Sequence, residues 1–245
     1  MEGMNGERPV LLLTGASGTL GTALGSALRS RYDVVAVRRF RQLRFASQLR
    51  SFVDPLDPAE PLEENVEPSY EIVADLSDVR EIGRVCDIAL AKFGRVDVLV
   101  NAAGVPGGAT LLRGGLRPAA RVFEINALVP IRIAVELTER FWRHDEAGNR
   151  ARSRCIVNLG AASSLDLAPH LGGAAFSSAK SSLNVLTGHL AHELAPFSVR
   201  ANVVAPAPFP TVVPTERVVA AVDQMISADE SGRMLVVWPD GDELI

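Results

Sequence analysis

Seven short runs rich in leucine and β-branched residues alternate with longer stretches of helical pattern along this chain. The runs cover residues 9–15, 33–38, 70–75, 96–104, 154–160, 199–206 and 234–238. The helical patterns cover residues 19–31, 78–93, 118–143, 174–195 and 215–228. Continuous apolar strands that alternate with helices are typical of a parallel sheet buried on both faces. With right-handed crossovers, this order predicts an α/β fold with a Rossmann-type, doubly wound parallel sheet of about seven strands.

Charge and cysteine content exclude several classes of function. The formal net charge of −4 provides no basic footprint for nucleic acid and no polybasic anchor for a membrane. The first apolar run is far too short to span a bilayer and lacks the arrangement of a signal peptide. Cys86 and Cys155 are too few for a disulfide framework or a zinc site, and we expect both to be small core residues. The sequence therefore predicts a cytoplasmic protein that binds a small molecule and no metal.

A glycine-rich segment separates the first apolar run from the first helical pattern. Residues 14–21 read TGASGTLG. Glycines at such a turn let backbone N–H groups approach a pyrophosphate, and the N-terminus of the following helix adds partial positive charge. The segment therefore predicts a dinucleotide site. Its contacts are expected from Gly15, Ser17, Gly18, Thr19, Leu20 and Gly21.

Two arginines at the end of the second run bear on the choice of dinucleotide. Arg38 and Arg39 stand where an acidic residue would accept hydrogen bonds from a ribose 2′-hydroxyl. Arginine there suits a 2′-phosphate and favours NADP(H) over NAD(H); ordinary surface arginines are the alternative. Asp75, followed by Leu76, is placed either to meet the adenine or to cap the helix that begins near Asp78.

The length and composition fit a single dinucleotide-binding domain over residues 1–245. A chain of 245 residues, 47% of them hydrophobic, can bury one sizeable core. Residues 40–69 break the alternation, because they begin basic and end acidic and rich in proline. This segment is predicted to be an exposed insertion, and a role in covering the adenine end of the ligand stays open.

With these features in view, the chain resembles the short-chain dehydrogenase/reductase family over nearly its full length. The resemblance rests on ordered motifs: TGASGTLG, Asp75-Leu76, Asn101-Ala102-Ala103-Gly104, Asn126, Asn158 leading to Ser163, Lys180, Ala201-Asn202 to Pro206, and MLVVWPDG at 234–241. The spacing of the three glycines in the first motif is nearer the family's longer-chain branch, whereas the length follows its compact branch. The resemblance implies that further cofactor contacts come from Asn101, Ala102, Ala103, Gly104, Lys180, Pro206 and Thr211.

The same resemblance implies a catalytic group of Asn126, Ser163, a tyrosine and Lys180. In that family, hydride from the nicotinamide reaches a carbonyl carbon while the tyrosine hydroxyl protonates the developing alkoxide. The lysine lowers that hydroxyl's pKa and holds the nicotinamide ribose, the serine orients the substrate oxygen, and the asparagine's helix keeps a water beside the lysine. In this chain Phe176, thirteen residues after Ser163 and four before Lys180, stands in the tyrosine's place.

No other tyrosine is placed to supply the missing hydroxyl. The chain has two tyrosines, Tyr32 and Tyr70, and both come before or at strand starts, at the end of the sheet opposite a ligand crevice. Losing a positioned general acid costs roughly 10²- to 10⁴-fold in rate. Asp166 and His170, in the loop after Ser163, are candidate proton donors. The alternative is a turn or cap for Asp166 and a position at the pocket rim for His170.

Other features bear on the pocket and on association. Ala207 follows Pro206 where the family usually has glycine, which adds a methyl group near the expected nicotinamide site. The chain then passes through three prolines into the next helix and leaves little lid, so the pocket is open or is completed by another chain. The helices at 118–143 and 174–195 are apolar on more than one face, which predicts a homodimer or homotetramer. The polar residues 144–152 are predicted to form an exposed turn.

Three functions remain open from the sequence. The first is an NADP(H)-dependent reductase or dehydrogenase whose proton comes from Asp166, His170, Ser163 or an ordered water. The second is a non-redox enzyme, such as a cyclase, isomerase or dehydratase of a specialised pathway, that uses Ser163 and Lys180 on a reactive carbonyl. The third is an inactive nucleotide-binding subunit that regulates or completes a partner.

Overall fold

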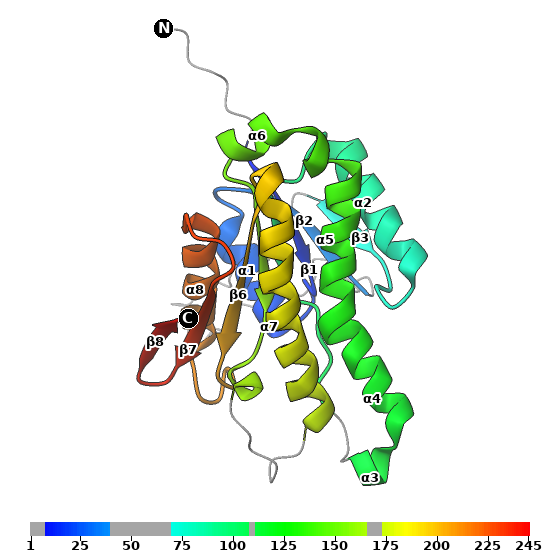
Figure 1. Ribbon diagram of the computed structural model, residues 1–245, viewed down its shortest axis with the longest axis vertical. Coiled ribbons are helices and arrows are strands. Elements are labelled where there is room, and N and C mark those ends of the chain that lie inside the picture. The colour runs from blue at the N-terminus through cyan, green and yellow to red at the C-terminus, as the bar shows by residue number, and fades with distance from the viewer. Residues whose placement is uncertain (1–7, 40–69, 108–110, 166–172) are drawn as a thin grey trace, which may run out of the picture.

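A computed structural model describes residues 8–39, 70–107, 111–165 and 173–245 of the chain; the segment 40–69, Asp166 and His170 lie outside the described residues. Its centre is an eight-stranded sheet with the order β3-β2-β1-β4-β5-β6-β7-β8 (Figure 1). The strands are β1 (Val10–Thr14), β2 (Asp33–Arg38), β3 (Tyr70–Val73), β4 (Val98–Asn101), β5 (Cys155–Leu159), β6 (Arg200–Pro206), β7 (Met234–Trp238) and β8 (Gly241–Leu244). Strands β1 to β7 pair in parallel, so the doubly wound α/β fold predicted from the sequence is confirmed.

The strand that the sequence does not predict is β8, which pairs antiparallel with β7 at the edge of the sheet. All four of its residues are exposed, so no apolar run marks it. Its register is set instead by a tight hairpin in which Trp238 pairs with Gly241. A polar edge strand of this kind is held by backbone pairing rather than by burial.

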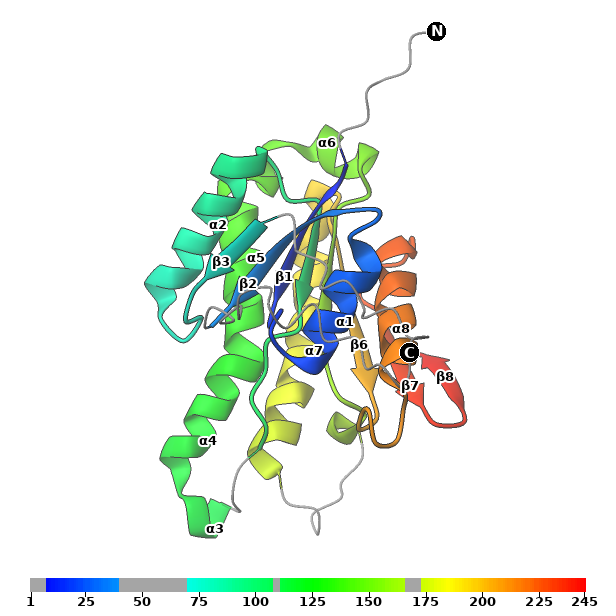
Figure 2. The ribbon, with the colours of Figure 1, turned by 180° about the vertical axis from the view of Figure 1, so that it is seen from behind.

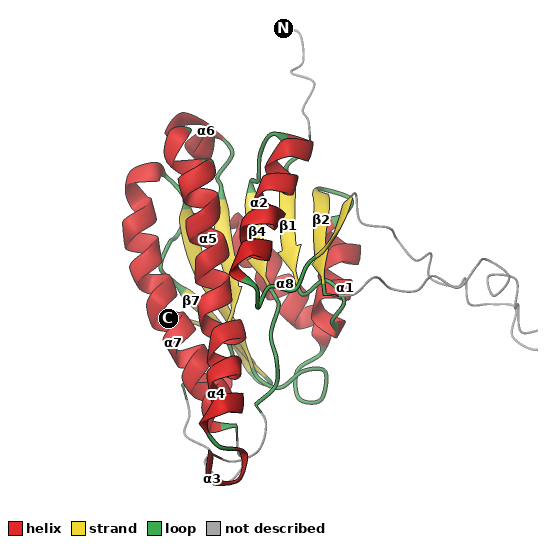
Figure 3. Cartoon of the chain, turned by 90° about the vertical axis from the view of Figure 1, so that its right-hand side faces the viewer, coloured by secondary structure: helices red, strands yellow, loops and turns green. Residues whose placement is uncertain are grey.

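Helices cover both faces of the sheet. The long helices are α1 (Thr19–Leu28) and α8 (Thr215–Ser227) on one face, and α2 (Val79–Phe93), α5 (Val129–Arg140) and α7 (Ala174–Leu194) on the other. Figure 2 shows α1 and α8 in front of the strands, and Figure 3 shows α5 beside α7 across the sheet from them. Leu11 and Leu13 of β1 join the core under α1 and α8, whereas Val10 and Leu12 join the opposite core. Burial on both faces explains why β1 is apolar throughout.

The predicted helix at 118–143 is divided into three joined segments. They are α4 (Leu116–Phe123), a π-helical turn (Glu124–Leu128) and α5. Pro130 lies at the start of α5. Because proline has no backbone N–H, it cannot donate the usual helical hydrogen bond to the carbonyl of Asn126. The helix therefore opens into a π-turn at Asn126, a deformation that is frequent at functional sites.

The predicted exposed turn at 144–152 is wrong, because the structure has a short helix there, α6 (Glu146–Ala151). The side chain of Asp145 caps it by accepting a hydrogen bond from the backbone N–H of Gly148 at 3.2 Å. Asn149 is fully buried and donates to the carbonyls of Trp142 and Phe197. The other residues of 144–152 are exposed or partly exposed, as predicted, and the buried amide of Asn149 is satisfied by backbone. The remaining short helices are α3 (Leu111–Gly114) and the 3₁₀ segments Trp142–His144, Ala162–Ser164 and Ala195–Phe197.

The two cysteines have no chemical role that the structure supports. Both are buried and free, and burial raises the pKa of Cys86 to about 12 and that of Cys155 to about 11. They are core residues, as the sequence predicts. Within the described ranges there is no cluster of three or more histidine, cysteine, aspartate or glutamate side chains suited to a metal ion. Among the helices described, none has the length and apolar character needed to cross a bilayer.

Candidate active site

The strand order creates a crevice at the carboxyl ends of β1 and β4. These two strands lie side by side in the sheet. Strands β2 and β3 continue the sheet beyond β1, and strands β5 to β8 continue it beyond β4. The loops that leave β1 and β4 therefore diverge, and ligands of open α/β sheets bind at such a switch point. Residues 15–18 follow β1 and residues 102–107 follow β4, so both segments border the crevice.

The glycine-rich turn is packed too closely for side chains at two of its glycines. Gly15 has a φ of +70°, and a Cβ there would lie 2.6 Å from the backbone nitrogen of Ala103. A Cβ at Gly21 would lie 2.2 Å from the carbonyl oxygen of Gly15. Leu20 anchors the start of α1 in the core. The turn is therefore fixed against both the loop after β4 and its own helix, as a dinucleotide turn requires.

The N-terminus of α1 remains accessible at this turn. Gly18 is its N-cap residue, and within the described residues no side chain caps the helix. Ser17, Gly18 and Thr19 are exposed, and a Cβ at Gly18 would approach only the Gly15 carbonyl oxygen, at 3.4 Å. The N–H groups of a helix's first turn have no intrahelical partner and lie at the positive end of its dipole. These residues therefore fit the pyrophosphate of a dinucleotide.

The two arginines at the end of β2, Arg38 within the strand and Arg39 just after it, differ in their surroundings. The guanidinium of Arg38 lies 3.1 Å from the carboxylate of Glu71 on β3, and its side chain is 11% exposed. Arg39 lies 3.1 Å from the carboxylate of Asp75, and both of these side chains are nearly half exposed. Arg39 is thus the more accessible of the two to a ligand in the crevice.

Asp75 does not cap α2. Its carboxylate accepts hydrogen bonds from the backbone N–H of Ser77 at 3.1 Å and from its hydroxyl at 2.7 Å. These bonds, with the charge of Arg39, lower the pKa of Asp75 below its usual value. The cap is Asp78, which accepts from the backbone N–H of Arg80 at 2.9 Å, so the capping alternative for Asp75 is wrong. Leu76, which follows Asp75, is buried in the core on the α2 face of the sheet, so its side chain packs inward rather than toward a ligand.

A chain of buried polar side chains crosses the sheet beneath the crevice. Asn101 on β4 donates to the Asn158 oxygen on β5 at 2.8 Å, and Asn158 donates to Thr187 on α7 at 2.9 Å. On the other side, the Thr14 hydroxyl accepts from the backbone N–H of Ala103 at 3.2 Å. Asn101 is 2% exposed, so its side chain positions the loop after β4 rather than meeting a ligand directly. Satisfied networks of this kind rigidify the site that they support.

Lys180, predicted as a site residue, lies on α7 with its amine buried. Its Nζ donates to the carbonyl oxygen of Leu159 at 2.6 Å, and the residue is 5% exposed. In the described part of the chain it forms no ion pair. Burial lowers its pKa to about 8, because desolvation disfavours the charged form. The ring centroid of Phe176 lies 5.7 Å from Nζ and offers a weak cation–π contact.

Asn126 holds the loop after β4 against α7. Its amide nitrogen donates to the carbonyls of Val105 and Val122 at 2.9 Å each, and its oxygen accepts from the Val105 N–H at 3.3 Å. A Cβ at Gly104 would lie 2.9 Å from that oxygen and 3.9 Å from the Lys180 amine. The glycine therefore allows bare backbone to border the lysine, and Asn126 fixes it there.

Ser163 is exposed in the 3₁₀ turn after β5, and the next residue fixes that turn to α7. The backbone carbonyl of Ser164 accepts a hydrogen bond from the Ser181 hydroxyl at 2.8 Å, and the Ser164 hydroxyl accepts one from the Asn184 amide at 2.8 Å. The Ser164 hydroxyl also donates to the Ala161 carbonyl at 2.6 Å. Ser163 is thus presented at the end of β5 by a turn that hydrogen bonds of Ser164 fix to α7.

Phe176 and the tyrosines lie where the sequence places them. Phe176 is half-buried in the first turns of α7, and a Cβ at Gly107 would lie 2.9 Å from its Cβ. Tyr32 directly precedes β2 and Tyr70 begins β3, so both are at the amino ends of their strands, away from the crevice. The predicted position of both tyrosines at strand starts is confirmed. Gly107 was not identified from the sequence, although a glycine after Pro106 and close to the 101–104 motif was a signal for close packing.

The segment after β6 completes the crevice. Pro206 ends β6, and Ala207 is 4% exposed with its methyl group in the core cluster shared with α1 and α8. The extra methyl that distinguishes it from glycine is therefore accommodated by packing. Thr211 is exposed on the short connection into α8. Leu159, which the sequence did not single out, contributes a backbone carbonyl, and a sequence carries no signal for that contact.

Comparison with known proteins agrees with this geometry. The short chain dehydrogenase family profile matches residues 9–221. An uncharacterized oxidoreductase of Methylorubrum extorquens is 30% identical over 200 residues, which cover 82% of this chain and 73% of that protein. Protein FixR of Bradyrhizobium diazoefficiens is 30% identical over 244 residues, covering 96% and 74% respectively. A short chain dehydrogenase/reductase family oxidoreductase from Brucella ovis, solved in complex with a partially ordered NAD, superposes with a TM-score of 0.73 at 23% identity, covering 94% of this chain and 100% of that one.

Proposed function

We propose that this chain, which belongs to the short-chain dehydrogenase family, is an NADP(H)-binding oxidoreductase that acts on a small carbonyl or hydroxyl compound without the family's tyrosine. The observation that carries this proposal is the uncapped N-terminus of α1, held by Gly15 and Gly21 against the loop that borders Lys180. Such an arrangement suits a pyrophosphate and directs the rest of the dinucleotide toward the carboxyl ends of the central strands. When bound, a nicotinamide supplies or accepts a hydride. The related structure from Brucella ovis was solved with NAD, which supports a nicotinamide dinucleotide as the cofactor class.

The preference for NADP(H) rests on Arg39. Its ion pair with Asp75 is nearly half exposed on both sides, and exposed pairs of this kind contribute only about 0–1 kcal/mol. A 2′-phosphate can therefore compete for the guanidinium at small cost. Arg38 is less suited, because its side chain is mostly covered and pairs with Glu71.

The protein's own residues divide the remaining work. Asn126 fixes the loop after β4, and Ser163 offers an exposed hydroxyl at the end of β5 for a substrate oxygen. Lys180 holds a proton at Nζ and, with its pKa near 8, can exchange it near neutral pH. In this proposal the proton of the reaction comes from Asp166, His170, Ser163 or an ordered water.

A second function is favoured by the pairing of Phe176 with a desolvated lysine. Among the described residues, the Lys180 amine has the Leu159 carbonyl as its hydrogen-bond partner and the Phe176 ring as its aromatic contact. That environment suits direct chemistry on a carbonyl without net redox change, as in a cyclase, isomerase or dehydratase. Nucleotide binding without any turnover would instead support an inactive regulatory subunit.

A matched pair of variants at Gly18 tests the nucleotide site. The position is open, with extended backbone, so Gly18→Asn and Gly18→Asp should both fold and cap α1. A carboxylate roughly 5 Å from the pyrophosphate costs about 1–3 kcal/mol per charge at effective dielectric constants of 20 to 80. We expect native protein to bind NADPH in a fluorescence titration and Gly18→Asp to bind it at least tenfold more weakly than Gly18→Asn. Equal affinity of the two variants, or no NADPH or NADH binding by the native chain, would refute the proposal.

Association into a homodimer or homotetramer through α5 and α7 is part of the proposal. Val135 on α5 is 46% exposed and Val185 on α7 is 62% exposed, and these helices lie side by side (Figure 3). Exposed apolar residues on two neighbouring helices support association through this face. The cytoplasmic location stays a prediction from the sequence.

A further inference from the structure

The amine of Lys180 has surroundings that differ from those of an ordinary lysine. It is one of only two lysines in the chain, the other being Lys92, which is exposed. Within the described residues, the Nζ has one hydrogen-bond partner, the neutral carbonyl of Leu159, and lies over the ring of Phe176. A desolvated ammonium without an anion loses its proton readily, and the free amine is a nucleophile.

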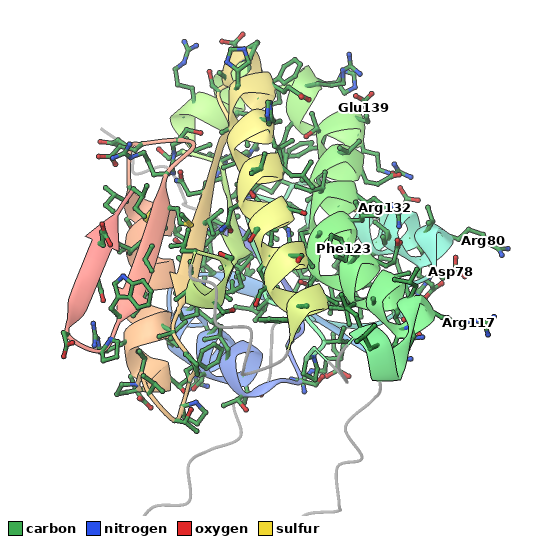
Figure 4. All side chains as sticks on the ribbon, turned by 60° about the horizontal axis from the view of Figure 1, so that its bottom comes forward. Asp78, Arg80, Arg117, Phe123, Arg132 and Glu139 are labelled. Carbon is green, nitrogen blue, oxygen red and sulfur yellow. The ribbon has the colours of Figure 1, made fainter. Side chains whose placement is uncertain are left out.

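The elements packed against α7 supply no carboxylate to this amine in the described residues. The helix packs on β6, α4, α5, the π-turn and the 3₁₀ turn that carries Ser163. Glu124 in the π-turn is paired with Arg132 of α5, and Arg200 of β6 donates to backbone carbonyls. Arg121 of α4 is exposed and positively charged, so it cannot stabilise an ammonium. Figure 4 shows Arg132 on the outer side of the α4–α5 helix.

Two glycines bring bare backbone close to the amine and to the ring. A Cβ on Gly104 would lie 3.9 Å from Nζ, and one on Gly107 would lie 2.9 Å from the Cβ of Phe176. At these two positions the loop after β4 approaches this end of α7 with no side chain of its own. Ser163, at the end of β5, exposes a hydroxyl on the neighbouring turn. A small, mainly apolar carbonyl compound matches an amine, a phenyl ring and a single hydroxyl better than a charged one does.

We propose that Lys180 is a nucleophile that forms an imine with a small apolar aldehyde or ketone bound beside Phe176. The lone pair of the neutral amine attacks the carbonyl carbon, the carbonyl π-electrons move to oxygen, and one N–H proton passes to that oxygen to give a carbinolamine. The second N–H proton leaves with the hydroxyl group as water while the nitrogen forms the C=N bond, so no oxidant or reductant is consumed. Ser163 is placed to hydrogen-bond the carbonyl oxygen. This inference rests on the second function proposed above, and it gives that function a covalent step.

The closing experiment uses reductive trapping of the folded chain. Native protein is incubated with propanal and sodium cyanoborohydride at pH 7.5, and propyl adducts on Lys180 and Lys92 are measured by peptide mass spectrometry. The pKa near 8 leaves roughly a quarter of Lys180 neutral at this pH, whereas an unperturbed lysine is only about 0.1% neutral. The ratio of Lys180 to Lys92 labelling is divided by the same ratio in chain unfolded with urea, which removes differences in local sequence.

We expect this normalised ratio to be at least tenfold, despite the burial of the amine. A value below tenfold overturns the inference, since it would mean that folding does not activate Lys180. In Phe176→Tyr the added hydroxyl should stabilise the ammonium and lower the ratio several-fold, and an unchanged ratio would exclude Phe176 from the activation. NADPH titration of the same samples separates the proposed cofactor site from the proposed imine. Absence of nucleotide binding would count against the cofactor site, whereas the labelling ratio tests imine formation at Lys180.

Discussion

Replacing Lys180 with methionine should remove the pH dependence of stability that this residue imposes. Burial lowers the pKa of Lys180 from 10.5 to about 8, a difference that corresponds to roughly 3 kcal/mol at pH values below both. Between pH 8 and 10.5 the unfolded chain binds more protons at this site than the folded chain. The free energy of unfolding therefore rises with pH across this window. Methionine has a similar length and no charge, so it removes this slope.

The expected sign of the difference changes with pH. At pH 7, methionine avoids the roughly 3 kcal/mol penalty but leaves the Leu159 carbonyl without its 2.6 Å donor, which costs about 1–3 kcal/mol. We therefore expect Lys180→Met to be more stable than native protein by about 1 kcal/mol at pH 7. Near pH 10 native protein should be more stable than the variant by about 1–2 kcal/mol.

Urea unfolding followed by the fluorescence of the buried Trp142 measures these free energies at pH 7, 8.5 and 10. The exposed Lys92→Met is the matched control, and its difference from native protein should not change between pH 7 and 9. A constant difference between native protein and Lys180→Met over the whole range would refute the reasoning. It would show that the folded chain holds Lys180 charged at its ordinary pKa.

Three further outcomes follow from the structure. Arg39→Gln should weaken NADPH binding about tenfold and leave NADH binding unchanged. The control is Arg80→Gln, which should change neither affinity, because the Arg80 side chain points away from the body at the start of α2 (Figure 4). Equal losses of affinity for both nucleotides in Arg39→Gln would exclude Arg39 from 2′-phosphate recognition. Phe176→Tyr should raise NADPH-dependent reduction of a panel of aldehydes by roughly 10²- to 10⁴-fold, and no gain in protein that binds NADPH would show that the missing hydroxyl is not what limits the site. Val185→Glu should shift the protein to smaller species in light scattering at micromolar concentration, and a native chain that is already monomeric would contradict association through α7.

The sequence predicts the fold well because each local signal agrees with the global arrangement. Every run predicted as a strand contains one, since burial on both faces demands uninterrupted apolar residues. The polar strand β8 and the short helix α6 escaped this reasoning for a shared cause. The position of β8 depends on backbone pairing, and that of α6 on the buried amide of Asn149. Neither interaction produces a periodic pattern of apolar residues in the sequence.

The candidate site is predicted less completely than the fold, and the features that were missed share a physical cause. Residue types with a strong constraint on space or charge, such as Gly15 and Lys180, are recognised from the sequence and are found at the crevice. Contacts made by backbone, such as the carbonyl of Leu159, cannot be read from residue identity. The same is true of partner choice, because only the structure shows that Arg38 is covered by Glu71 while Arg39 stays accessible.

The two halves of the crevice are constrained in different ways, and this difference bears on function. On the nucleotide side, Gly15 and Gly21 admit no side chain, so that turn is compatible with very few sequences. On the side of the crevice near Phe176, burial of the Lys180 amine raises the free energy of the folded state, and the Phe176 ring gives the ammonium little stabilisation. A methionine would fill the same volume without the desolvation penalty. A costly group that packing alone does not require is best explained by use of its amine, and the proposed imine gives it a use that does not need the hydroxyl lost at Phe176.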